Sequence, residues 1–240
     1  MTVRSPITTE RRPNRMLAQF VLFEGFDPLD VIAPYEVLIS AGALTGGALQ
    51  VELASAEGAR DVPSGLTGIT LKATTALDPA RADIVIVPGA AGDLRPPEGL
   101  SPGEREQLIP AILHRAAQTS LPSLVGEALN DGRTLVAAVC GGSMILAMAG
   151  LTKGRHVTGH RLGLADMKAN FTETHVIDAR VVVDDRLITA GGVTSGLDLA
   201  LYLVEREIGP RIANELEKLF EHERRGTVWA PTGAGPAFDL

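Results

Sequence analysis

Residues 134–143 read TLVAAVCGGS, and this stretch decides which fold the chain can adopt. Residues 134–139 form a short apolar run with the length of a fully buried strand. Cys140 follows at once, and the two glycines after it allow a tight turn into a helix expected to begin at Met144. A buried strand that turns directly into a helix is typical of an α/β protein.

Similar units lie on both sides of this stretch. Further strands are predicted at residues 16–23, 49–54, 69–73, 83–87, 156–158, 180–183 and 187–189. Further helices are predicted at 104–119, 162–170, 196–208 and 210–225, and one begins near Pro34 and ends at 40. A second short helix is predicted shortly before Asn130. Thr194 or Ser195 is expected to cap the helix at 196–208. The alternation predicts an α/β fold with a mostly parallel sheet and helices on both faces.

The domain organisation is simple. We predict a flexible segment at residues 1–15, one domain at 16–225 and an irregular tail at 226–240. The sequence contains no internal repeat.

Composition narrows the class of protein. Of the 240 residues, 45% are hydrophobic, which is enough to build a core. A net charge of −7 and an aromatic content of 4% argue against nucleic-acid binding. A single cysteine cannot form an internal disulfide, and no apolar stretch reaches the ~18 residues that a membrane span needs. We therefore predict a cytoplasmic protein with no membrane partner.

Cys140 admits two interpretations. A thiol at a sharp strand-to-helix turn is placed as a nucleophile is, and the helix start would stabilise a thiolate and lower its pKa. Alternatively, Cys140 is a buried structural cysteine, the commonest fate of a lone cysteine. The residue type alone favours a structural cysteine. The surrounding sequence V-C-G-G-S makes the nucleophile and the structural cysteine equally good interpretations.

The turn at residues 88–92, Pro-Gly-Ala-Ala-Gly, follows another buried strand. The carboxyl ends of parallel strands meet at one edge of a sheet, so this turn is expected near Cys140. The backbone N–H groups of Gly89, Ala90 and Gly141 are candidate donors to negative charge on a substrate. An ordinary turn between strand and helix is the alternative.

Three further side chains are candidates for proton transfer. A buried Asp30 would have a raised pKa and could exchange a proton with a substrate, and Glu36 is the rival acid. Taken alone, Asp30 fits better as an ordinary carboxylate at the start of a helix. His160 is a candidate base for Cys140, although a structural histidine fits equally well. No spacing typical of a metal site occurs, and the glycine-rich 190–196 loop lacks the lysine of a phosphate-binding loop. We predict no cofactor and no metal.

Five segments together carry a family resemblance. They are residues 20–38, 83–89, 139–143 with 149–151, the segment around His160, and 190–200. In order and chemistry they resemble the ThiJ/PfpI superfamily, which has a flavodoxin-like fold of the class I glutamine amidotransferase type. The isonitrile hydratase branch is the most similar, and the resemblance extends from about Met16 to Arg225.

The resemblance implies a mechanism. Cys140 would be the nucleophile and Asp30 its catalytic partner. The thiolate would attack the terminal carbon of a small isonitrile, R–N≡C, to form a thioimidate that water converts to an N-formamide. No metal or organic cofactor takes part, and the family pattern predicts a homodimer.

Two departures from the pattern bear on the substrate. Gly141 stands where threonine is expected in isonitrile hydratases and histidine in the protease branch, and the 93–132 segment is longer than usual. A ligand-binding sensor like those of AraC-type regulators is an alternative, although no helix-turn-helix segment or basic patch follows the predicted last helix. A redox-sensing or glyoxalase-like protein is another, although those carry glutamate where Asp30 stands.

Overall fold

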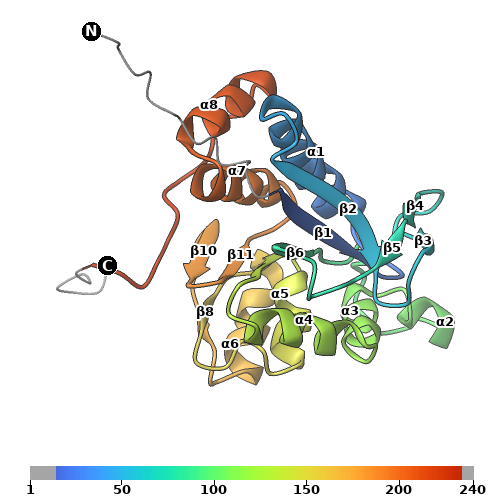
Figure 1. Cartoon of the computed structure of the whole chain (residues 1–240). Helices are drawn as coiled ribbons and strands as arrows, with labels where there is room; N and C mark the ends of the chain where they lie inside the picture. Colours follow the sequence, from blue (N-terminus) through green and yellow to red (C-terminus); the bar gives the residue numbers. More distant parts are fainter. Residues whose placement is uncertain (1–14, 234–240) are drawn as a thin grey trace, which may run out of the picture.

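The computed structural model describes residues 15–233, which surround one central sheet (Figure 1). The strands are β1 (Met16–Leu22), β2 (Leu49–Ser55), β3 (Arg60–Pro63), β4 (Thr70–Ala73), β5 (Thr75–Ala76), β6 (Ile84–Val87), β7 (Leu135–Val139), β8 (His156–Val157), β9 (His175–Val176), β10 (Val181–Asp184) and β11 (Leu187–Ala190). The helices are α1 (Pro28–Leu44), α2 (Pro102–Arg105), α3 (Ile109–Ala117), α4 (Leu121–Asn130), α5 (Gly142–Met148), α6 (Leu164–Asn170), α7 (Ser195–Glu207) and α8 (Pro210–Leu219), with a 3-10 turn at Arg161–Gly163.

The central sheet has seven strands in the order β10-β11-β7-β6-β1-β2-β5. Every neighbouring pair is parallel except β10 with β11, which form an antiparallel hairpin. Helices α1, α7 and α8 cover one face, and α3, α4 and α5 lie against the other (Figure 1). The predicted α/β fold with a mostly parallel sheet is confirmed.

The middle strands explain why the sheet needs two helical layers. Every residue of β6 and β7 is buried, as is every residue of β1 after Met16. Their apolar side chains point alternately to both faces, so each face must be covered. The carboxyl ends of β1, β6 and β7 therefore lie side by side, where three turns meet.

Helix α1 begins earlier than the sequence pattern predicted. It starts at Pro28, because Asp27 caps it by accepting the N–H of Leu29 at 2.9 Å and because proline suits a first helical position. Pro34, expected near the helix start, lies inside the helix instead. Its ring packs against Gly196, where an added Cβ would lie 3.3 Å away, so tertiary packing compensates for the missing backbone hydrogen bond.

The predicted helix at 104–119 is wrong as a single element. A capping box between Ser101 and Glu104 starts α2, and the chain is extended at Leu108 before α3 begins. Pro110 explains the break, because it has no N–H to continue the first helix and it restricts the residue before it. The predicted last helix also ends early, at Leu219 rather than 225, where Glu221 takes a left-handed conformation with φ of 49°.

The first part of the predicted irregular tail is tied to the sheet. The N–H of Trp229 donates to the carbonyl of Val181 at 2.9 Å, and the N–H of Val183 donates to the carbonyl of Trp229 at 2.8 Å. The domain limits 16–225 stay a prediction, and residues 1–14 and 234–240 lie outside the described part. Across 15–233, no helix has both the length and the apolar character that crossing a lipid bilayer demands.

The contact between α1 and β2 can be tested at Gly42. A Cβ there would lie 2.2 Å from the carbonyl oxygen of Leu49, so the helix would have to move away from the strand. We expect Gly42→Ala to lower the free energy of unfolding by about 2 kcal/mol, measured by urea denaturation. Gly103→Ala is the control, because nothing lies within 4 Å of its Cβ position. Equal midpoints for the two variants would contradict the packing described.

Candidate active site

Cys140 occupies the turn between β7 and α5. Its φ of 58° is in the left-handed region, which is unfavourable for a residue with a side chain. The conformation is held from both sides. The Cys140 N–H donates to the carbonyls of Ala190 and Gly191 at 3.1 and 3.0 Å, and the Cys140 carbonyl accepts the N–H of His160 at 3.2 Å. Strain held this firmly is typical of functional positions.

Two glycines let the neighbouring turns approach. A Cβ on Gly142 would lie 2.3 Å from the carbonyl oxygen of Val87. A Cβ on Gly89 would lie 2.5 Å from the nitrogen of Gly141, 2.8 Å from Oδ2 of Asp30 and 3.1 Å from the Cβ of Cys140. Any side chain at these positions would separate the turns. The glycines therefore bring the carboxyl of Asp30 beside the thiol.

Asp30 is fully buried in the first turn of α1. Its Oδ2 accepts the N–H of Gly89 at 2.9 Å, and its Oδ1 has no hydrogen-bond partner within the described residues. Burial first and the charge of Asp27 second raise the pKa of Asp30, the Gly89 N–H and the Cys140 thiol oppose the shift, and the resulting pKa is about 8. The predicted raised pKa is confirmed. A carboxyl in this state can both accept and donate a proton near neutral pH.

The thiol behaves differently from the prediction made from its sequence context. Burial raises the pKa of Cys140 above its usual range, and the charge of Asp30 raises it further. Hydrogen bonds from the N–H groups of Val193 and Gly141 lower it by less. The predicted lowering of the thiol pKa is therefore wrong, because desolvation outweighs the donors at the helix start. The resting cysteine is a neutral thiol beside a carboxyl that is the stronger acid.

The three candidate N–H donors do not have the same role. Gly89 donates to Asp30, so it positions the acid and is not free for a substrate. Among residues 15–233, no backbone or side-chain oxygen accepts the N–H of Ala90 or of Gly141. Both residues are buried beside Cys140. The Gly141 N–H acts on the Cys140 sulfur, so the N–H of Ala90 is the one of the three that stays a predicted donor to negative charge on a bound molecule.

The side chains of Glu36, the rival acid, and His160, the candidate base, do not form hydrogen bonds with Cys140 among the described residues. Glu36 is exposed on α1, so it does not share the buried site of Asp30. The Nδ1 atom of His160 accepts the N–H of Leu162 at 3.3 Å, and its ring packs on Gly192. No hydrogen bond joins the ring to Cys140 in the part of the chain described. The structure brings His160 close through its backbone, and its role as a base stays a prediction.

Val193 is the site residue that was not predicted from the sequence. It lies in the loop between β11 and α7, and its φ of 40° is rare for a β-branched residue. Its N–H acts on the sulfur of Cys140. From the sequence this loop was considered only as a phosphate-binding loop and was excluded for lack of a lysine, although its place after a strand that pairs with β7 points to the site. The predicted side-chain cap of α7 is also wrong, since neither Thr194 nor Ser195 caps it.

The long segment at 93–132 also reaches the site. A Cβ on Gly141 would lie 3.0 Å from both terminal methyl groups of Leu113, which belongs to α3. The space that a larger residue would need at 141 is therefore occupied by Leu113. No group of three or more His, Cys, Asp or Glu side chains is arranged to hold a metal ion within residues 15–233.

Comparison with known proteins agrees with this geometry. The sequence profile described as the DJ-1/PfpI family matches residues 113–206, which include Cys140 and His160. Over 206 residues the chain is 32% identical to isonitrile hydratase from Pseudomonas putida, a match that covers 85% of this chain and 77% of that protein.

The chain belongs to the DJ-1/PfpI family.

Other members of the family have diverse names. The chain is 27% identical over 225 residues to the HTH-type transcriptional regulator GbdR from Pseudomonas aeruginosa and spans 55% of its length. It is 29% identical over 202 residues to the glutathione-independent glyoxalase DJR-1.2 from Caenorhabditis elegans. The crystal structure of Drosophila melanogaster DJ-1beta matches 87% of this chain and 99% of its own with a TM-score of 0.67 at 23% identity. The fold is thus that of DJ-1/PfpI proteins, which include enzymes and regulators.

The burial of Asp30 predicts a pH-dependent gain in stability on its replacement. Its pKa rises from 3.8 to about 8, so the folded protein holds the proton more tightly than the unfolded chain. The stabilising contribution of the protonated Asp30 carboxyl is therefore fully present below pH 3.8 and is lost as the pH rises toward 8. We expect Asp30→Asn, which keeps an acceptor for Gly89, to raise the free energy of unfolding at pH 8 by at least about 2 kcal/mol.

Urea denaturation at several pH values measures this difference. The gain should shrink steadily between pH 8 and about pH 4. Glu36→Gln, which changes an exposed acid on the same helix, should show no such trend. A constant difference across this range for Asp30→Asn would show that the carboxyl is not held protonated by burial.

Proposed function

We propose that this protein is a cysteine-dependent hydratase that converts a small isonitrile to an N-formamide through a thioimidate on Cys140. The observation that carries the proposal is the buried pair of Cys140 and Asp30, in which the carboxyl has a pKa of about 8. The 32% identity with the isonitrile hydratase of Pseudomonas putida supports the choice of substrate class. No metal or organic cofactor enters the proposed reaction.

The first step forms a carbon–sulfur bond. The Asp30 carboxylate removes the proton of the Cys140 thiol as the sulfur attacks the terminal carbon of R–N≡C. Asp30 then delivers that proton to the same carbon, which gives the thioimidate R–N=CH–S–Cys140. The high pKa of the thiol supports this order, since a neutral thiol needs a base at the moment of attack.

Water completes the reaction in two further steps. Asp30 takes a proton from water as the water oxygen adds to the thioimidate carbon, and it passes this proton to the nitrogen to give R–NH–CH(OH)–S–Cys140. The carbon–sulfur bond then breaks, Asp30 takes the proton of the hydroxyl, and the formamide R–NH–CHO leaves. The sulfur regains a proton from Asp30. One isonitrile and one water are consumed for each formamide, and the N–H groups of Gly141 and Val193 stabilise the departing sulfur.

Turnover of small isonitriles by single-residue variants tests this mechanism. We expect Cys140→Ala to abolish formamide production, because no other cysteine exists in the sequence. Asp30→Asn should lower kcat by at least about 100-fold, the usual contribution of a positioned acid–base group. Glu36→Gln is the matched control and should turn over as the wild type does. Formamide release by Cys140→Ala would overturn the mechanism.

Alternative activities are separated by the same assay. Methylglyoxal and small amides are tested beside the isonitriles, with Cys140→Ala as the blank. Consumption of methylglyoxal alone would favour a glyoxalase-like enzyme, as the similarity to DJR-1.2 suggests. Binding without turnover would favour a sensor, as the similarity to GbdR suggests.

The pH dependence of turnover follows from the state of Asp30. The reactive form has a carboxylate at Asp30, so kcat/KM should rise about tenfold per pH unit below pH 8 and level off above it. The rate with Asp30→Asn should lack this rise. A profile that is flat between pH 6 and pH 8 in the wild type would exclude Asp30 as the base.

We also propose that the protein is a homodimer with a small-molecule substrate. Three large apolar side chains, Leu29, Ile32 and Ile39, are exposed along one side of α1. Leu66 is exposed in the loop after β3, and this loop meets the start of α1 through a hydrogen bond from Gly65 to Phe26. Several large apolar side chains exposed on neighbouring elements are typical of a protein interface.

Light scattering on variants of this surface tests the dimer. We expect the double variant Ile32→Asp, Ile39→Asp to be monomeric, since two carboxylates would have to be buried in the interface. Leu219→Asp changes an exposed leucine on α8 and is the control. A dimer that persists in the double variant would place the interface elsewhere.

A further inference from the structure

A buried carboxylate lies outside the pair already described. Asp198, in the first turn of α7, has a side chain that is 4% exposed. Its Oδ2 accepts the guanidinium Nε–H of Arg180 at 2.5 Å. Its Oδ1 accepts the backbone N–H of Arg225 at 2.9 Å and lies 3.3 Å from Nε2 of His222. A buried charge with this many partners is fully compensated.

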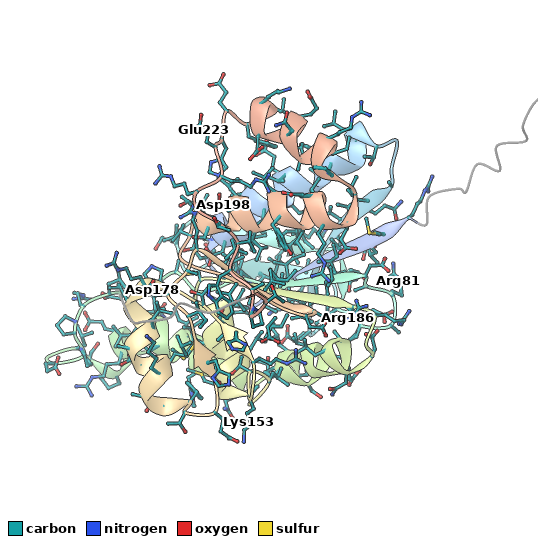
Figure 2. All side chains as sticks on the ribbon, turned by 90° about the vertical axis from the view of Figure 1, so that its left-hand side faces the viewer. Arg81, Lys153, Asp178, Arg186, Asp198 and Glu223 are labelled. Carbon is teal, nitrogen blue, oxygen red and sulfur yellow. The ribbon has the colours of Figure 1, made fainter. Side chains whose placement is uncertain are left out.

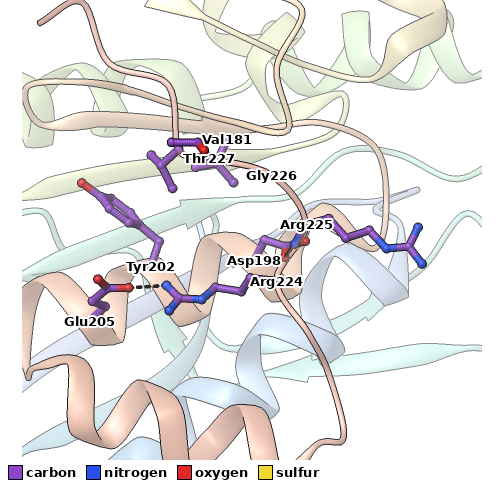
Figure 3. A pocket seen from close by; sticks show the side chains of 9 residues that line it. Val181, Asp198, Tyr202, Glu205, Arg224, Arg225, Gly226 and Thr227 are labelled. Atoms are coloured by element: carbon purple, nitrogen blue, oxygen red, sulfur yellow. Dashed lines mark hydrogen bonds and ion pairs between the residues drawn. The ribbon is translucent and has the colours of Figure 1, made fainter. Parts of the chain in front are cut away.

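The partners come from two segments, one after α8 with His222 and Arg225 and one before β10 with Arg180. Figure 2 shows the labelled residues Glu223, Asp198 and Asp178 along the same side of the molecule. Figure 3 shows the Asp198 carboxyl against the backbone at Arg225, while the neighbouring Arg224 pairs with Glu205. Asp198 is therefore the point at which both segments are fixed.

Arg180, which is bound to Asp198, also contacts the loop at residues 190–195. Its guanidinium NH2 group donates to Oγ1 of Thr194 at 3.2 Å, beside the bond to Asp198. Its backbone carbonyl accepts the N–H of Gly191 at 2.9 Å. The planar guanidinium holds two acceptors in a fixed relation, which a single ammonium group cannot do. Arg180 thus holds the loop near both of its ends.

The loop in turn contacts Cys140 directly. The carbonyl of Gly191 accepts the N–H of Cys140 at 3.0 Å. Val193, two residues on, has a φ of 40°, a conformation that persists only where the surroundings impose it. Gly192 packs on the ring of His160 on the other side. The loop is held between Arg180 and the nucleophile.

We infer that Arg180 and Asp198 form a positioning pair, which holds the backbone of the 190–195 loop against Cys140. Neither side chain touches the reacting atoms. The pair acts through the backbone of the loop, and it stabilises negative charge on sulfur both during attack and during release of the product. The inference rests on the proposed function only in taking Cys140 as the nucleophile.

Alkylation of Cys140 by iodoacetamide tests the pair without any substrate. The protein has one cysteine, so the rate reports this sulfur alone. In Arg180→Met the loop loses this anchor beside Cys140, and we expect alkylation at pH 8 to slow about tenfold, as for loss of one hydrogen bond to a charged group. Thr194→Val removes only one contact of Arg180 at an exposed position and should slow it about threefold.

Whether alkylation of Cys140 becomes slower or faster distinguishes a positioning role of Arg180 from a purely structural one. A loop that was merely loosened would expose the sulfur and speed alkylation. Arg224→Met is the matched control, because it breaks the ion pairs with Glu205 and Glu217 and leaves the loop alone. Arg180→Lys should recover only part of the rate, since lysine cannot hold Asp198 and Thr194 together.

Each outcome decides the inference. Unchanged or faster alkylation in both Arg180→Met and Thr194→Val would overturn it, and if Arg180→Met does not fold, Thr194→Val decides alone. In the turnover assay, kcat should fall in these variants with little change in KM. If the wild type turns over no isonitrile but alkylation slows as expected, the proposed function fails and the positioning pair stands. If the wild type turns over isonitriles but alkylation is unchanged in the variants, the proposed function stands and the positioning pair fails.

Discussion

The structure depends on the close approach of three backbone turns at the carboxyl ends of β1, β6 and β7. No Cβ fits at Gly89 or Gly142, so the turns lie in direct contact and exclude water from the space between them. The carboxyl of Asp30 is buried in that space with one N–H as its partner. Its raised pKa, its closeness to Cys140 and the high pKa of the thiol all follow from this one packing constraint. The closeness of Cys140 and Asp30, on which the proposed reaction depends, is thus a consequence of backbone proximity.

Burial also decides how the pair can react. In water a thiol ionises more readily than it does here, where desolvation and a neighbouring carboxyl both oppose the thiolate. A site of this kind does not store a reactive anion. In the proposed reaction the proton stays on this pair until the substrate accepts it, and the N–H groups of Gly141 and Val193 stabilise the charge on sulfur as it forms. The left-handed backbone at Cys140 and Val193 is the strain that this arrangement requires.

The sequence predicted the buried strands, the turn at Cys140 and the raised pKa of Asp30, because each depends on local pattern or on burial of one group. It failed where tertiary contacts decide. Pro34 stays inside α1 because Gly196 leaves room for its ring, and that contact joins residues far apart in the chain. The thiol pKa was predicted from the helix start alone, whereas desolvation by all surrounding elements sets its direction. Val193 was not predicted as a site residue because valine normally avoids a positive φ, so nothing in the residue type indicates the conformation that it has here.

One wall of the site comes from the 93–132 segment. Leu113 of α3 lies where a side chain at position 141 would point, so glycine at 141 and leucine at 113 fit each other. The resemblance to isonitrile hydratases led us to expect a threonine hydroxyl at this position, and apolar methyl groups lie there instead. If the proposed reaction takes place beside this wall, the substrate should carry an apolar group next to the reacting carbon, because a polar group would lose its water there without gaining a partner.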